Sequence, residues 1–205
     1  MMFKLLRIFL LTLISLFLPY TQASTVLVLG DSLSAAYQLP VESGWVHLLE
    51  QEVNQQGKSI NIINASISGE TTQGGAARLT SLLQEQPKLV ILELGANDAL
   101  RGYPLKTTKS NLIKMIQASK LAGAKVLLIG NQIPPNYGRR YSTAFFQLYQ
   151  DIAKQEEVSL VAFMLDNVAL NQDLMLNDGL HPNAQGQTFV LENIMPKVLP
   201  LLELK

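Results

Sequence analysis

The sequence of 205 residues contains no cysteine, and this absence excludes a disulfide framework, a thiol nucleophile and a thiolate metal site. Histidine is almost as scarce, because the chain has only two. Two histidines are too few for a multi-histidine metal site, so we expect no bound metal. If the chemistry needs an imidazole base, only His47 or His181 can supply it.

An excess of charge of either sign is also missing, since sixteen basic residues balance sixteen acidic ones. This balance, with 48% hydrophobic residues, is atypical of basic nucleic-acid-binding domains and of disordered chains. The chain has neither a Gly-x-x-x-x-Gly-Lys phosphate loop nor a Gly-x-Gly-x-x-Gly turn, which disfavours nucleotide binding. No repeat or Pro/Gly-rich linker divides residues 24–205, so we expect a single domain there.

The first two dozen residues differ in composition from the rest. Lys4 and Arg7 precede an almost wholly apolar run over residues 8–18. Pro19 breaks the run, and Thr21-Gln22-Ala23 places small residues where a signal peptidase needs them. This layout predicts a secretory signal peptide over residues 1–23 that is removed after Ala23, so that residues 24–205 work in the periplasm or outside the cell. The alternative is an uncleaved anchor, although the run is shorter than the roughly 20 residues of a membrane span.

Short apolar runs alternate with segments of helical period in the remaining chain, which indicates strands and helices in turn. The predicted strands are Thr25–Leu29, Ile60–Asn64, Leu89–Glu93, Lys125–Ile129 and Ser159–Phe163. The predicted helices are Trp45–Gln55, Ala76–Gln86, Lys106–Ala122, Thr143–Glu157 and Ala184–Leu199, the last of which Pro196 could interrupt. Continuous apolar strands separated by helices predict a parallel sheet of about five strands in a three-layer α/β/α sandwich.

His181 is the stronger candidate for a catalytic base. It lies in Asn177-Asp178-Gly179-Leu180-His181-Pro182, a turn-forming segment in which Asp178 could bond the imidazole Nδ1–H and leave Nε2 free to accept a proton. A surface loop with a capping aspartate explains the same residues. His47 lies inside a helical pattern and is expected to be an ordinary helix residue.

Three other polar turns follow predicted strands, where ligands bind in parallel α/β sheets. Ser32, in Gly30-Asp31-Ser32-Leu33, could be a nucleophile, or Asp31 or Ser32 could simply cap a short helix. Gly69 could bring a bare N–H to a ligand, and Asn97 could donate an amide N–H to the same point. Together with Asp178 and His181, these turns supply a nucleophile, a base, a group that orients the base, and oxyanion donors.

In this order the four segments resemble the four sequence blocks of the SGNH (GDSL) hydrolase family. The matching residues are Gly30-Asp31-Ser32-Leu33, Ser68-Gly69-Glu70-Thr71, Gly95-Ala96-Asn97-Asp98 and Asp178-Gly179-Leu180-His181-Pro182. The resemblance implies a flavodoxin-like fold, a catalytic triad of Ser32, Asp178 and His181, and an oxyanion hole formed by Ser32, Gly69 and Asn97. It implies no cofactor.

Further segments are similar to the thioesterase and lysophospholipase branch of the family, notably Asn64–Gly69 and Pro135–Tyr141. This similarity implies cleavage of fatty acyl thioesters and esters, including lysophospholipids. We expect a monomer, because the sequence shows no long uncovered apolar helix that demands an oligomer. Glycines stand in that branch at the positions of Ala36 and Ala96, so each alanine adds a methyl group near the site. The alternatives are a carbohydrate O-acetyl esterase with the same triad and a non-catalytic flavodoxin-like binding module.

An apolar groove for the acyl chain is expected beside the third and fourth strands. Leu100, Ile133 and Pro134 are the candidate substrate-binding residues, with Leu174, Met175 and Leu176 as further apolar neighbours. These side chains could equally be ordinary core or loop residues. The resemblance, more than their hydrophobicity, favours the lipid groove.

Overall fold

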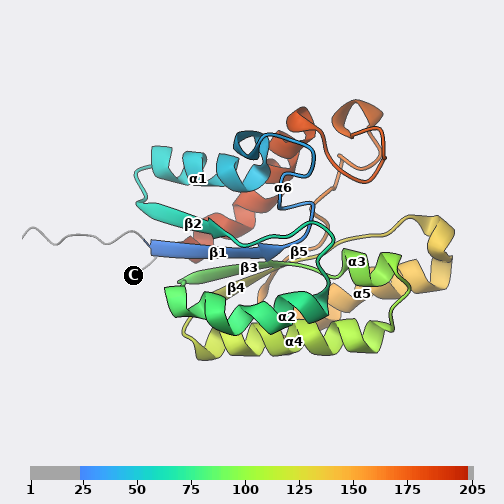
Figure 1. The fold of residues 1–205 in the computed structure, drawn as a ribbon, viewed down its shortest axis with the longest axis horizontal. Helices are drawn as coiled ribbons and strands as arrows, with labels where there is room; N and C mark the ends of the chain where they lie inside the picture. Colours follow the sequence, from blue (N-terminus) through green and yellow to red (C-terminus); the bar gives the residue numbers. More distant parts are fainter. Residues whose placement is uncertain (1–23, 203–205) are drawn as a thin grey trace, which may run out of the picture.

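The computed structural model describes residues 24–202, so the predicted signal peptide lies outside the described residues. Its centre is a five-stranded parallel sheet in the order β2-β1-β3-β4-β5 (Figure 1). The strands are β1 (Ser24–Gly30), β2 (Ile60–Asn64), β3 (Leu89–Glu93), β4 (Lys125–Ile129) and β5 (Ser159–Val161). The sequence prediction of a parallel sheet of about five strands is confirmed.

Helices cover both faces of this sheet, which makes three layers (Figure 1). Helices α1 (Trp45–Gln55) and α6 (Ala184–Leu202) pack on one face, and α2 (Thr72–Leu82), α4 (Leu105–Leu121) and α5 (Arg139–Glu156) pack on the other. Along β1, Val26 and Val28 are buried on the first face, while Leu27 and Leu29 are buried on the second. The central parts of β1, β3 and β4 are apolar because both of their faces are covered, whereas the edge strand β2 carries the exposed Asn61 and Asn64.

Parallel pairing places the carboxyl ends of neighbouring strands at one edge of the sheet. Gly30 at the end of β1 lies opposite Glu93 at the end of β3, and Leu92 of β3 lies opposite Leu128 of β4. The loops after these strands therefore start side by side. This edge is where the four polar segments of the sequence meet.

Several helix boundaries differ from the sequence prediction. Helix α2 begins at Thr72 instead of Ala76, because the Thr71 side chain accepts the N–H of Gly74 and caps the helix. A β-carbon on Gly75 would lie 2.4 Å from Leu94, so the glycines that lower helix propensity there allow close packing. Helix α5 also begins earlier than predicted, at Arg139.

Helix α6 runs through Pro196 without the interruption considered from the sequence. Both Pro196 and Pro200 lie on its exposed face, where water can bond the carbonyls that lose an N–H partner. A short helix, α3 (Ala96–Leu100), follows β3 and was not predicted. Across residues 24–202, none of the helices has the length and apolar character needed to cross a membrane.

Candidate active site

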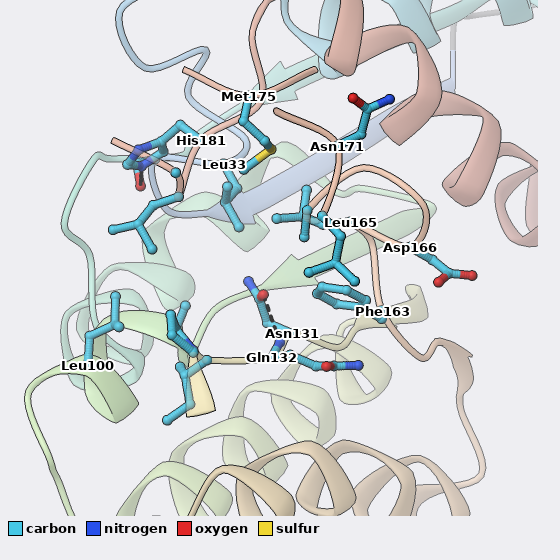
Figure 2. A pocket seen from close by; sticks show the side chains of 18 of the residues that line it. Leu33, Leu100, Asn131, Gln132, Phe163, Leu165, Asp166, Asn171, Met175 and His181 are labelled. Atoms are coloured by element: carbon cyan, nitrogen blue, oxygen red, sulfur yellow. Dashed lines mark hydrogen bonds between the residues drawn. The ribbon is translucent and has the colours of Figure 1, made fainter. Parts of the chain in front are cut away.

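A cavity of ≈ 1200 Å³ lies at the carboxyl edge of the sheet (Figure 2). The loops after β1, β3 and β4 form part of its wall, and the segment between β5 and α6 forms the rest. Ser32, Asn97 and His181 all line it. The sheet thus brings together residues that lie up to 149 positions apart in the sequence.

Ser32, His181 and Asp178 form a continuous chain of hydrogen-bonding atoms. The Ser32 Oγ lies 2.8 Å from His181 Nε2, and His181 Nδ1 lies 2.7 Å from Asp178 Oδ2. The other carboxylate oxygen, Asp178 Oδ1, accepts the N–H groups of Leu180 and His181 at 2.9 and 3.0 Å. The ring of Tyr37 lies against the imidazole with centroids 4.4 Å apart. The turn and the tyrosine together fix the orientation of His181.

The carboxylate of Asp178 is held in its charged form. Partial burial raises the pKa of Asp178, but the hydrogen bonds from the Leu180 N–H and from His181 outweigh this and leave the pKa below its usual value. A charged Asp178 favours a proton on Nδ1 of His181. Nε2 is then free to accept the Ser32 hydroxyl proton.

Ser32 is presented by a turn that Asp31 closes. The Asp31 carboxylate accepts the N–H of Leu33 at 3.0 Å, and its backbone carbonyl accepts the N–H groups of Ser34 and Ala35. Asp31 therefore does stabilise a local turn, as the capping alternative supposed, while Ser32 faces the cavity. No α-helix begins here; turns and then a short 3₁₀ helix (Val41–Ser43) lead to α1 instead.

Two of the three predicted oxyanion donors, Ser32 and Asn97, line the cavity, whereas Gly69 is not among its lining residues. Within residues 24–202, no group accepts the backbone N–H of Ser32 or of Gly69. Gly69 has φ +80°, and its carbonyl, in the peptide that follows the donor N–H, accepts a bond of 2.9 Å from Arg101 Nη2. Asn97 Nδ2 donates to Asp31 Oδ2 at 3.0 Å, and this bond uses one of its two hydrogens. The second hydrogen is available to a ligand.

Glu93 ties the serine turn to β3, and sequence reasoning missed it. Its Oε2 accepts the Asp31 N–H at 3.2 Å and the Ser34 hydroxyl at 2.8 Å. Burial raises the pKa of Glu93 well above its usual value, and the charge of Asp31 raises it further. Burial also raises the pKa of Asp31, to about 6, although the Leu33 N–H and the Asn97 amide oppose the shift. A charged residue ending an otherwise apolar strand was the available sequence signal.

The three residues expected to bind substrate, Leu100, Ile133 and Pro134, all line the cavity. Of the further apolar neighbours, Met175 lines it as well, whereas Leu174 is buried in the core between the sheet and α6. Sequence reasoning missed Leu33, Phe163, Leu165 and the buried Asn131 in the same wall (Figure 2). These residues are close only because the chain returns to this edge after β4 and β5.

Of the other candidate residues, only Ala96 lies in the lining of the cavity. His47 is on α1 and does not line it, in agreement with the expectation of an ordinary helix residue. Ala96 contributes to the lining, but Ala36 does not. Ala36 has a left-handed backbone with φ 55° and faces Gly44, where an added β-carbon would lie 2.8 Å from its own. In the described part of the chain, no group of three His, Asp or Glu side chains is arranged to hold a metal ion.

Comparison with known proteins gives consistent matches over nearly the whole described chain. A family model described as the GDSL-like lipase/acylhydrolase family matches residues 28–189. The chain is 48% identical to esterase TesA of Pseudomonas aeruginosa over 181 residues, which cover 88% of this chain and 90% of that protein. It is 42% identical to thioesterase 1/protease 1/lysophospholipase L1 of Escherichia coli K12, over 88% of this chain and 86% of that one. The structure of the psychrotrophic esterase EstA from Pseudoalteromonas sp., inhibited by monoethylphosphonate, is similar with a TM-score of 0.83 at 42% identity, covering 88% of this chain and 100% of that one.

Proposed function

This chain belongs to the GDSL-like lipase/acylhydrolase family, and we propose that it is a serine hydrolase that cleaves fatty acyl thioesters and esters, lysophospholipids among them. The observation that carries the proposal is the hydrogen-bonded series from Asp178 through His181 to Ser32, which ends at the wall of a large cavity. If Ser32 only capped a helix or closed a turn, its hydroxyl would not need to lie 2.8 Å from the imidazole of His181, which is 149 residues further along the chain.

Ser32 is the nucleophile of the proposed reaction. As its Oγ attacks the acyl carbonyl carbon, His181 Nε2 takes the hydroxyl proton. Asp178 keeps the imidazole in the required tautomer and stabilises the imidazolium that forms. The lowered pKa of Asp178 supports this role, because the carboxylate stays charged when the imidazole becomes protonated.

The negative charge on the substrate oxygen is stabilised by the N–H groups of Ser32 and Gly69 and by the amide of Asn97. Asp31 acts as a positioning residue, since its bond to Asn97 Nδ2 sets the direction of the remaining N–H. The imidazolium of His181 then protonates the departing thiol or alcohol, and an acyl-enzyme forms on Ser32. Water activated by His181 releases the carboxylic acid. Each step uses side chains and backbone of this chain, without a metal or cofactor.

A fatty acyl group suits the cavity. Its volume of ≈ 1200 Å³ exceeds the roughly 300–1,000 Å³ typical of small-molecule sites. Leu33, Leu100, Ile133 and Pro134 supply an apolar wall beside the serine. The names of the relatives, an esterase and a thioesterase with lysophospholipase activity, support the same substrate class.

We also propose that residues 1–23 direct export, and that the mature chain acts in the periplasm as a monomer. The sequence layout of residues 1–23 supports the first part. N-terminal sequencing of the purified exported protein tests it, with Ser24 expected as the first residue. Light scattering tests the second part, with the mass of a single chain expected.

The experiment that tests the activity compares the mature protein with its Ser32→Ala variant. We would measure kcat/KM on p-nitrophenyl esters from acetyl to palmitoyl and on the matching acyl-CoA thioesters. Activity that favours medium or long chains and disappears in the variant is expected. Serine-dependent activity confined to acetyl esters would instead favour a carbohydrate O-acetyl esterase, and absence of any activity would favour a binding module.

A further inference from the structure

Asn131 is a polar side chain buried in the wall of the substrate cavity. It follows β4, is only 3% exposed, and lies among apolar lining residues that include Leu33, Ile133 and Leu165. Its Oδ1 accepts the backbone N–H of Gln132 at 2.9 Å. Because an N–H must meet the oxygen end of the amide, this bond identifies Nδ2 as the other end.

The Nδ2 group of Asn131 has no hydrogen-bond partner anywhere in residues 24–202. Figure 2 shows this end of the amide pointing into the space ringed by the lining side chains. A buried donor without an acceptor is costly, and nearly all buried polar groups in proteins have a partner. An occupant of the cavity is therefore the available partner of Nδ2, and that occupant must offer an acceptor atom.

The strand order indicates which part of a substrate lies beside Asn131. Ser32 follows β1, Asn97 follows β3 and Asn131 follows β4, and these three strands are consecutive neighbours. Two strand spacings, roughly 9.5 Å, separate β1 from β4 along the sheet edge. The leaving group must stay near His181, which protonates it, so the acyl chain is the part that extends past Asn97 towards Asn131.

On the basis of the proposed function, we propose that Asn131 donates a hydrogen bond to an oxygen on the acyl chain, so that the enzyme prefers hydroxy- or oxo-acyl substrates to unsubstituted chains of equal length. A plain alkyl chain leaves Nδ2 unpaired. An acyl chain with a hydroxyl or keto oxygen at the right carbon pairs it. The preference for the substituted chain then has two sources: the hydrogen bond that its oxygen accepts, and the cost of leaving Nδ2 unpaired when an unsubstituted chain is bound.

The test compares octanoyl-CoA with octanoyl thioesters that carry a hydroxyl at carbon 3, 6 or 8. The net value of one hydrogen bond predicts that the best hydroxylated substrate has a kcat/KM about 3- to 10-fold above that of octanoyl-CoA in the wild-type protein. In Asn131→Leu, which replaces the amide with an apolar group of similar size, this ratio should fall to about one or below. Gln132→Ala is the matched control, because it alters the neighbouring cavity side chain but keeps the backbone N–H that orients Asn131; its ratio should equal that of the wild type.

Two results would overturn the proposal. One is a wild-type protein that hydrolyses none of the hydroxylated thioesters faster than octanoyl-CoA, and this result decides the question even if Asn131→Leu fails to fold. The other is an Asn131→Leu variant that keeps the wild-type ratio. Failure of the proposed function itself would look different, because octanoyl-CoA hydrolysis would then be absent or would survive in Ser32→Ala.

Discussion

Replacement of Glu93 separates two contributions of this buried carboxyl group, acceptance of hydrogen bonds and ionisation. Its Oε2 accepts two buried donors, the Asp31 N–H and the Ser34 hydroxyl, and both belong to the turn that presents Ser32. Glu93→Ala removes the acceptor from both donors. Glu93→Gln keeps an acceptor oxygen in nearly the same volume and cannot ionise.

The expected loss of stability follows from the two donors. A buried donor left without a partner costs about 1–3 kcal/mol. Glu93→Ala should therefore lower the free energy of unfolding by about 2–6 kcal/mol, before any effect of the cavity that it leaves. Glu93→Gln should stay within about 1 kcal/mol of the wild type at pH values below 4.5, the ordinary pKa of a glutamate.

The pH dependence has a definite sign. Folding raises the pKa of Glu93 well above 4.5, because of burial and the nearby charge of Asp31. A group whose pKa rises on folding gives its full stabilisation below its unfolded pKa and loses it as the pH rises through the folded pKa. The wild type should therefore lose stability relative to Glu93→Gln as the pH is raised from below 4.5 through the elevated pKa of Glu93.

Urea unfolding of the three proteins at several pH values measures these differences, and kcat/KM on an octanoyl ester reports on the serine turn. We expect Glu93→Ala to lose about 10²-fold in kcat/KM under conditions where it is folded, because displacement of a reacting group by about 1 Å costs that much. A Glu93→Ala variant within 1 kcal/mol of the wild type and fully active would refute the reasoning. A stability difference between the wild type and Glu93→Gln that does not vary with pH would refute the assigned pKa direction.

Three further predictions concern the site and its support. Asn97→Ala should lower kcat on a p-nitrophenyl ester by about 10²–10³-fold with little change in KM, and a near-normal kcat would remove Asn97 from the oxyanion hole. Asp178→Asn should lower kcat by about 10⁴-fold by favouring the wrong tautomer of His181, whereas a loss below tenfold in steady-state assays would contradict the role given to the carboxylate. Gly95→Ala should destabilise the fold by more than about 2 kcal/mol in thermal or urea unfolding, since Gly95 has φ 120° and its β-carbon would lie 2.5 Å from the Tyr149 hydroxyl; unfolding that matches the wild type would argue against this packing.

The sheet and its flanking helices could be predicted from the sequence because their signals are local. Four of the five strands were predicted to within a residue at each end, since buried strands appear as short apolar runs between turn residues. The fifth ends at Val161 instead of Phe163. A β-carbon on Gly130 would lie 2.3 Å from the Ala162 carbonyl oxygen, so the segments after β4 and β5 pack closely against each other here. Strand propensity, which is a local property of the sequence, does not report this contact.

The helix starts were harder to predict because they depend on tertiary contacts. Thr72 lies inside α2 with its N–H bonded to the Asp98 carboxylate, 26 residues further along the chain. The two glycines at 74 and 75 weaken the helical pattern at that point, so a reading of periodicity starts the helix too late. Pro196 suggested a possible break in the last helix, but α6 continues through it. The effect of a proline inside a helix depends on whether it lies on the face that meets water, and the sequence alone does not show that face.

For the site, the polar turns after the strands were visible because each interrupts an apolar pattern. Ser32, Asn97 and His181 meet at one edge as expected for a parallel sheet. Glu93 and Asn131 were missed because their importance comes from neighbours on other strands, namely the serine turn for Glu93 and the apolar cavity wall for Asn131. One sequence cannot show these contacts without the register of the sheet.

The central claim is that Ser32 carries the acyl group during turnover. A phosphonate ester that reacts with serine hydrolases, followed by peptide mass spectrometry, tests it most directly. We predict one phosphonyl group per chain, on the peptide that contains Ser32, with loss of ester hydrolysis in proportion to labelling and no labelling of Ser32→Ala. Labelling of another residue, or hydrolysis that persists in the fully labelled protein, would contradict the account.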